Sequence, residues 1–320
     1  MDALFYPIKL MADFIVGSVF GVSSDSRLFE VIHFFIYDTI KILILLAIII
    51  YLVSIIRSFL PPEKIKKILT HKLPFIGNIL AALFGIVTPF CTCSAIPLFL
   101  GFIEAGVPVG VTFSFLIASP MINEVALILL LGMFGWKIAL LYILSGLLIA
   151  VVAGFILGRI GAERWITLLE TKKSNKNNNI VTWKTSTAYA ARYTKHIIRN
   201  VWLYVIFGIA IGALIHGYVP TDFLARYADS SKWYAVPFAT LLGIPLYSNA
   251  AGIVPLVSVL TEKGVAMGTV LAFMMAVTCL SLPEFMILKK VLKTRLILIF
   301  ATIVGLGIML TGYLFNQVLN

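Results

Sequence analysis

Apolar stretches long enough to cross a lipid bilayer are the feature that most constrains this chain. A helix needs about 20 apolar residues to cross the roughly 30 Å hydrocarbon core, and such stretches, beginning with residues 31–60, recur along nearly the whole sequence. Hydrophobic residues make up 61% of the chain and charged residues 12%, against roughly 45 to 50% and about 25% in soluble proteins. The sequence therefore predicts an all-α, multi-pass protein of the cell membrane, embedded in lipid and without a separate soluble domain.

The net charge of +11 is explained by membrane topology. The 25 Lys and Arg residues lie mostly between the apolar stretches, where cytoplasmic loops normally carry them. The charge therefore indicates an orientation in the membrane and not a nucleic-acid partner. Residues 1–21 have no basic n-region and no small-residue cleavage site, and we expect them to stay as an interfacial or partly inserted helix.

The chain carries an internal repeat. We therefore predict an N-terminal membrane repeat at residues 1–160, a basic polar linker at residues 161–196 and a C-terminal membrane repeat at residues 197–320. Apolar composition alone produces chance Leu and Ala matches, but not paired Gly, Pro and Glu residues at one offset. The offset of 158 residues pairs Gly85 with Gly243, Pro97 with Pro255, Glu104 with Glu262, Gly106 with Gly264, Gly110 with Gly268 and Phe115 with Phe273, and a two-residue gap then pairs Glu124 with Glu284.

Four breaks interrupt the apolar stretches, two in each half, at residues 88–94, 119–124, 244–249 and 278–284. The segments beside them are short: residues 95–104 would form about 15 Å of helix, half of the hydrocarbon core. We predict that the segments on either side of each break form one discontinuous helix with the break near the midplane. This gives about eight transmembrane segments, and interrupted helices in matching positions of two repeats are typical of secondary transporters.

The relative orientation of the two repeats has two interpretations. Eight spans make the repeats parallel and leave Glu104 and Glu262 at a membrane surface. Five crossings per half make the repeats inverted and gather the basic clusters near residues 57–72, 159–199 and 289–295 on the cytoplasmic face. The second count buries Glu104 and Glu262 in the bilayer, which is costly. We therefore expect eight spans.

All three cysteines lie in predicted breaks: Cys91 and Cys93 follow Pro89, and Cys279 is in the last break. Pro89 enforces its break because proline lacks an amide N–H and disfavours helix at the preceding residue. A set of two or three thiols suits a thiophilic substrate. Two alternatives stay open, namely small core residues and a thiol-redox couple.

Polar residues in the other breaks are candidates for contacts with substrate. Asn123 and Glu124 lie in the second break, and Tyr247, Ser248 and Asn249 occupy the third. A carboxyl group at this depth should face water or a partner. Burial would favour its neutral form, as proton coupling requires, or Glu124 could instead hold the broken backbone together. Glu284 is the equivalent group, although Lys289 and Lys290 could draw it toward the interface.

Nothing in the sequence indicates an enzyme, a cofactor or a metal centre, because it contains no phosphate-binding glycine loop, no His-Glu-x-x-His and no nucleophile elbow. Three motifs, Thr-Pro-Phe-Cys-Thr-Cys-Ser at residues 88–94, Ala-Gly-Val-Pro-Val-Gly at 105–110 and Ala-Ser-Pro-Met-Ile-Asn-Glu at 118–124, resemble the predicted permease family that includes bacterial organoarsenical efflux permeases. The resemblance covers about residues 31–315. It implies an eight-span permease for a small-molecule substrate and, for members of known function, extrusion of trivalent arsenicals. Transport of another small solute, such as a sulfur compound, and a membrane thiol-redox component are the alternatives.

Overall fold

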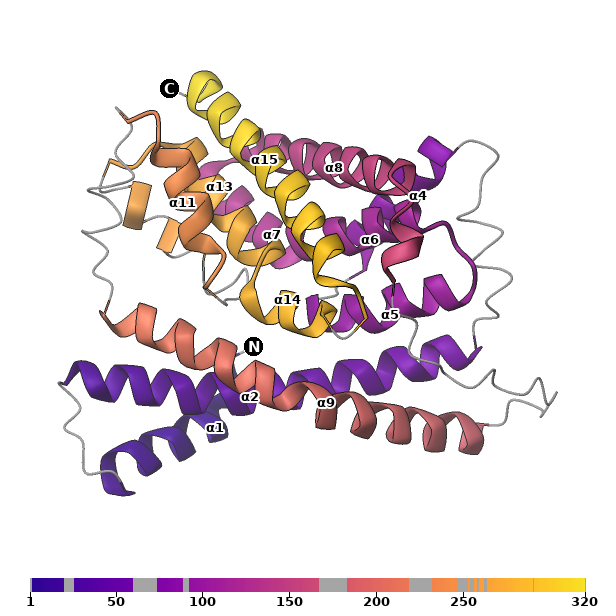
Figure 1. Cartoon of the computed structure of the whole chain (residues 1–320). Coiled ribbons are helices and arrows are strands. Elements are labelled where there is room, and N and C mark those ends of the chain that lie inside the picture. Colours follow the sequence, from indigo (N-terminus) through magenta and orange to yellow (C-terminus); the bar gives the residue numbers. More distant parts are fainter. Residues whose placement is uncertain are drawn as a thin grey trace.

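The computed structural model describes residues 2–19, 26–59, 74–88, 92–166, 183–218, 232–246, 253, 256–257, 259–261, 264–289 and 291–319 (Figure 1). These residues are helical apart from turns and one isolated antiparallel β-bridge. In chain order the helices are α1 (Asp2–Phe14), the π-helix η1 (Ile15–Val19), α2 (Arg27–Phe59), α4 (Pro74–Val87), α5 (Thr92–Glu104), α6 (Val109–Met121), α7 (Glu124–Phe134), α8 (Trp136–Arg159), the 3-10 helix η2 (Ala162–Trp165), α9 (Trp183–Tyr218), α11 (Ala235–Gly243), α13 (Met267–Cys279), α14 (Leu282–Leu288) and α15 (Thr294–Val318).

Among the described residues, three helical stretches are long and apolar enough to cross a membrane: α8, α15 and the stretch Met267–Leu288 formed by α13 and α14. A fourth is the pair α6 and α7, which passes the same test if it is one span bent by 48°. Their outer faces are apolar. α15 exposes Leu306, Leu310 and Leu314, which lie four residues apart and so form one stripe along the helix. Such a surface fits hydrocarbon and not water, so the chain is a multi-pass membrane protein.

α8 and α15 run in opposite directions. Ile166, just after α8 and η2, forms the antiparallel bridge with Leu292, and the amide of Lys293 donates to the carbonyl of Trp165 at 2.9 Å. α8 therefore ends where α15 begins. Further along, a Cβ on Gly307 would lie 3.2 Å from the Ile149 side chain, so the two helices also pack against each other. The eight-span model predicts that these equivalent helices are parallel, and that orientation is wrong.

α4 and α5 do not form one interrupted helix, as the sequence analysis expects, but a helical hairpin. α4 runs in the direction of α6, because its first turn contacts α8 through Phe75 and Phe155, whose rings are 6.0 Å apart, and its last turn packs Gly85 against Phe115. α5 runs the other way. Its Phe99 stacks edge-on to Phe113 at 5.1 Å, and these residues lie seven positions before and after Gly106, at the turn between α5 and α6. The chain therefore reverses its direction between α4 and α5.

Several contacts recur at the offset of 158 residues. A Cβ on Gly85 would lie 3.1 Å from the Phe115 carbonyl oxygen, and one on Gly243 would lie 3.1 Å from that of Phe273. Gly106 and Gly264 both adopt positive φ values, 77° and 85°, which an L side chain rarely tolerates. Likewise α6 and α13 each have 13 residues, and the glycine pairs Gly110 with Gly154 and Gly268 with Gly312 bring the helix backbones together in each half.

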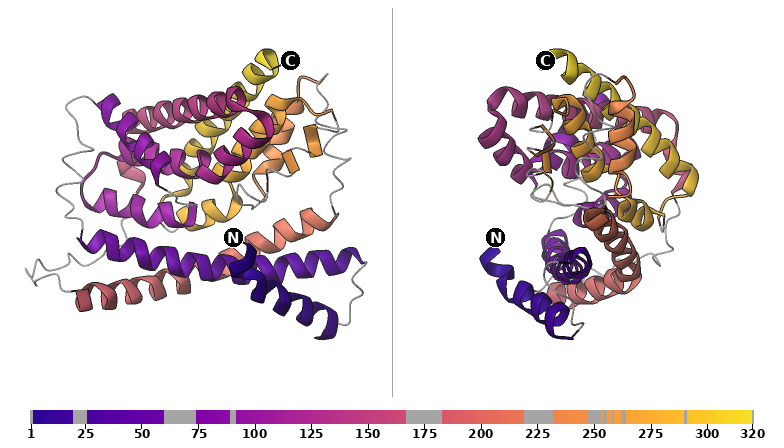
Figure 2. Two further views of the ribbon diagram at one scale, coloured as in Figure 1. Left: turned by 180° about the vertical axis from the view of Figure 1, so that it is seen from behind. Right: turned by 90° about the vertical axis from the view of Figure 1, so that its left-hand side faces the viewer.

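The long helices α2 and α9 pack against each other along one side of the bundle, and α1 leans on α2 (Figure 2). His33 of α2 contacts Asp13 of α1 at 2.9 Å. α9 begins at Trp183, within the segment that we expected to be a polar linker, so part of that segment is helical. α2 also contacts α5, and α9 contacts α14, which connects this helix pair to the centre of the bundle.

Candidate functional site

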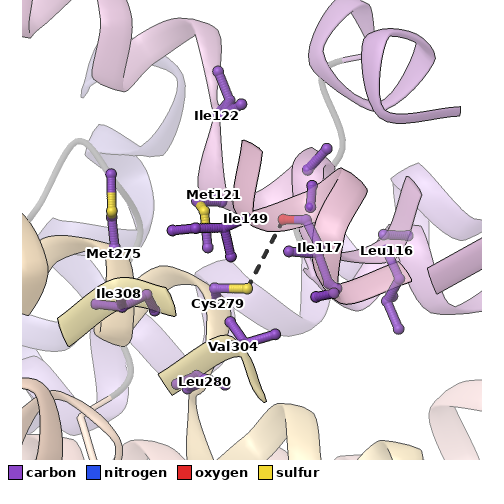
Figure 3. Close-up of a cluster of buried hydrophobic side chains, with 14 of the residues drawn as sticks. Leu116, Ile117, Met121, Ile122, Ile149, Met275, Cys279, Leu280, Val304 and Ile308 are labelled. Carbon is purple, nitrogen blue, oxygen red and sulfur yellow. Dashed lines mark hydrogen bonds between the residues drawn. The ribbon is translucent and has the colours of Figure 1, made fainter. Parts of the chain in front are cut away.

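The breaks of the chain meet at the centre of the bundle. The Cys279 thiol, at the end of α13, donates to the carbonyl of Ile117 near the end of α6 at 3.8 Å (Figure 3). The amide of Leu282, at the start of α14, donates to the carbonyl of Ile244 just after α11 at 2.9 Å. The end of α4 also reaches this point, because a Cβ on Gly85 would lie 3.2 Å from the amide of Ser119. We call residues 117–124, 244–246 and 278–284 the break cluster.

The positions of the breaks within the break cluster follow from local backbone chemistry. α6 continues through Pro120, where the sequence predicts the break, and ends at Met121; Ile122 leaves the helical conformation with φ −112° and ψ 76°. Proline removes one intrahelical hydrogen bond and so weakens the turn in which it lies. Pro283 lies in the first turn of α14, where a missing amide hydrogen costs nothing. In both broken spans, the second helix begins three residues after the first one ends: α7 follows α6, and α14 follows α13.

Glu284 is the most deeply buried carboxyl group that the structure describes, with 1% of its surface exposed. Within the described part of the chain, neither carboxyl oxygen has a hydrogen-bond partner, and the same is true of the nearby Ser281 hydroxyl. Cys279, five residues before Glu284, is also fully buried. Burying an ionised carboxylate without a partner is very costly, so a group in this position is a functional candidate by default.

The two glutamates differ in burial. Glu124, the first residue of α7, is half-buried, and Asn123 before it accepts a hydrogen bond from the Leu127 amide at 3.0 Å. The expectation that lysines draw Glu284 toward the interface is wrong, because Lys289 is exposed while Glu284, five residues earlier, is enclosed. Glu284 is therefore the stronger of the two candidates.

Tyr142 is a component of the site that the sequence analysis misses. Its side chain, on α8, is fully buried, and its hydroxyl donates to the carbonyl of Met121 at 2.7 Å, at the last residue of α6. A tyrosine inside an apolar span has no distinguishing sequence pattern, so only the contact with the broken end of α6 identifies it.

The remaining predicted residues are less defined. Pro89, Cys91, Tyr247, Ser248 and Asn249 lie outside the described residues, and of Cys93 only the backbone, in the first turn of α5, is described. Where the structure is described, no three or more His, Cys, Asp and Glu side chains gather in a way that could hold a metal ion. The structure thus brings Cys279 and Glu284 together, with Asn123 and Glu124 at the neighbouring break.

The helices of this protein break and meet around a buried carboxyl group. This arrangement places it among the multi-pass membrane proteins that have a polar site inside the helix bundle. Within this class, residues 27–317 match the family model described as predicted permease, and the chain belongs to that family. Membership of a permease family favours a transporter over an enzyme.

Three curated relatives support this assignment. UPF0718 protein MJ0584 of Methanocaldococcus jannaschii is 22% identical over 296 residues, covering 72% of this chain and 81% of that protein. A Streptococcus mutans protein named as a subunit of a two-component membrane permease complex is 29% identical over 255 residues, with 77% and 81% covered. UPF0718 protein YraQ of Escherichia coli is 22% identical over 263 residues, with 81% and 73% covered. No solved structure matches the chain.

Proposed function

We propose that this permease is a secondary transporter that moves a small solute through the break cluster by alternating access of its two halves. The opposite directions of α8 and α15, with the glycine contacts that recur at an offset of 158 residues, support two repeats of inverted topology. In such transporters the site lies where the repeats meet near the midplane, at the ends of interrupted helices. The meeting of helix ends in the break cluster supports assigning the site to this position.

The observation that carries the proposal is the environment of Glu284. Its carboxyl group is enclosed, has no hydrogen-bond partner among the described residues and follows Cys279 by five residues. Cys279 is itself fully buried. The described conformation is therefore closed to both sides at this point, and rotation of one half against the other would open the break cluster to one side at a time.

A neutral, thiophilic solute suits this site best. The Cys279 thiol offers one soft ligand, and the sequence positions of Cys91 and Cys93 beside the first break add two more. A methylated trivalent arsenical has fewer open valences than arsenite, so thiols would release it more readily. The resemblance to organoarsenical efflux permeases favours the same substrate class and export.

Proton coupling is the proposed role of Glu284. A carboxyl group that is enclosed in one conformation and wet in the other would bind and release a proton once in each cycle. Arg159, Arg164 and Arg295 lie at the shared end of α8 and α15. Because basic residues mark the cytoplasmic side, protons would enter from the opposite face in exchange for solute leaving the cell.

Flux measurements in proteoliposomes test both proposals. Methylarsenite uptake into inside-out vesicles should increase when the vesicle lumen is acidified, and Cys279→Ser should slow the flux about 10-fold or more. Glu284→Gln should abolish acceleration by the pH gradient, while the matched variant Glu163→Gln, at an exposed carboxyl, should behave like the native protein. If flux driven by the pH gradient survives Glu284→Gln, Glu284 is excluded as the coupling group. Arsenical flux that survives substitution of all three cysteines would exclude a thiol site.

A further inference from the structure

A groove between α2 and α9 is separate from the break cluster. Its volume is about 620 Å³, and its surface is almost entirely apolar, with walls that include Ala47 and Ile48 of α2 and Ile198 of α9. Two cationic side chains, Lys195 and Arg199, also line it. They are exposed and lie four residues apart, so they share one face of α9. The groove therefore combines an apolar floor with a positively charged rim.

Thr194 provides an independent indication of a ligand. It lines the same groove, only 8% of its surface is exposed, and its hydroxyl has no hydrogen-bond partner in the described part of the chain. Several other threonines bond within their own helix, as Thr112 donates to Pro108 at 3.0 Å and Thr240 to Val236 at 2.8 Å, whereas Thr39, outside the groove, also has an unpartnered hydroxyl among the described residues. A buried hydroxyl without a partner costs free energy. The Thr194 oxygen is itself covered, so rotation of its side chain toward the groove would let a ligand supply the acceptor.

The position of the groove along the helices agrees with its charge. It lies in the second half of α2 and the first half of α9, toward the end of the bundle where α2 ends and α9 begins (Figure 1). Arg159 and Arg164, at the end of α8, lie toward the same end. Since basic residues mark the cytoplasmic side and basic pockets between helices on that side bind anionic lipid head groups, the groove faces the leaflet in which such a ligand occurs.

We infer that the α2–α9 groove binds a phospholipid with an anionic head group. The acyl chain covers the apolar walls, and the phosphate accepts hydrogen bonds from Lys195, Arg199 and the Thr194 hydroxyl. Tyr51, which also lines the groove, offers a further donor. A small soluble anion would leave the apolar walls in water, whereas a phospholipid complements both the walls and the charge. Because α9 contacts α14, the bound lipid would also support the helix that carries Glu284.

Native mass spectrometry of the full-length protein, purified and stripped of lipid, tests the inference. Phosphatidylglycerol and phosphatidylcholine with identical acyl chains are titrated separately, and glycerol 3-phosphate serves as the water-soluble head group. We expect phosphatidylglycerol to bind more tightly than phosphatidylcholine. Removing both charges with Lys195→Gln and Arg199→Gln should weaken phosphatidylglycerol binding about 25-fold, at about 5-fold per charge. Thr194→Val should weaken it about 5-fold.

Two further variants separate charge from shape. Lys9→Gln with Lys137→Gln removes the same charge from exposed positions outside the groove and should leave binding unchanged. Ala191→Phe, which fills the groove without altering charge, should abolish tight phosphatidylglycerol binding. Equal binding of the two lipids, or binding that survives both Ala191→Phe and the loss of Lys195 and Arg199, would overturn the inference. Competition by glycerol 3-phosphate at concentrations equal to those of the lipid would overturn it in favour of a soluble anion.

Discussion

The thiol of Cys279 donates to the carbonyl of Ile117 at 3.8 Å, although 162 residues separate the two in sequence. α13 ends at Cys279 and α6 ends at Met121, so the contact joins the C-terminal ends of two helices that occupy equivalent places in the two halves. The two helices approach this point from opposite sides of the bundle (Figure 1). In an inverted arrangement, helices from matching positions of the two repeats approach from opposite directions and meet at their C-terminal ends. In a parallel arrangement, the same two helices would run in the same direction.

The first prediction concerns topology. Because the start of α4 packs against the end of α8 through Phe75 and Phe155, we expect the loops before α4 and after α8 to lie on one side of the membrane. Cysteines introduced at Glu63 and Ser174, in a background without native cysteines, should be modified from the same side by an impermeant thiol reagent. A cysteine at Gln317, in the last turn of α15 at its opposite end, should react from the other side. Modification of positions 63 and 174 from different sides would restore the eight-span model.

The second prediction concerns the cost of the buried carboxyl. Replacing Glu284 with leucine removes polar atoms that have no hydrogen-bond partner among the described residues and should stabilise the protein by about 1 to 3 kcal/mol, visible as a raised midpoint of thermal unfolding. Transport should be lost at the same time. Gain of stability with loss of activity is expected of a functional site. If Glu284 instead held the break together, the same substitution would lower the midpoint.

A third prediction concerns Tyr142. Tyr142→Phe removes the donor to the Met121 carbonyl and leaves that acceptor buried, so we expect a loss of about 1 to 3 kcal/mol in unfolding free energy. Tyr6, exposed on α1, is the matched control, and Tyr6→Phe should change stability by less than about 0.5 kcal/mol. Equal unfolding midpoints for the two variants would show that the buried hydrogen bond does not support the end of α6.

The fourth prediction concerns the close approach of α6 and α8. A Cβ on Gly110 would lie 2.6 Å from the carbonyl oxygen of Gly154, so Gly110→Ala should destabilise the protein by about 1 to 3 kcal/mol. Gly268→Ala, the equivalent change against Gly312, should cost a similar amount. Gly132, which has open space around it, provides the control, since alanine there should be neutral or stabilising by up to about 1 kcal/mol. Thermal unfolding of the three variants in one detergent would reveal any departure from this order.

The membrane class, the permease family and the places where helices end were accessible from the sequence. Pro120, Pro283 and the Gly106 turn are local signals, and helices end or turn within a few residues of each. The ranking of the two glutamates was not accessible. Glu124 and Glu284 have similar sequence surroundings, but their burial depends on which distant helices cover them, and Glu284 is the enclosed one.

The sequence by itself determined that this chain is a multi-pass helical membrane protein, because apolar length and composition leave a membrane as the only solvent for its surfaces. The direction of the chain after each break was decided only by the tertiary structure. Local backbone chemistry is the same whether α5 continues α4 or turns back, and the difference lies in packing against α6 through Phe99, Phe113 and Gly85. The contact of Cys279 with Ile117, which brings the ends of α13 and α6 together, is likewise a product of tertiary packing.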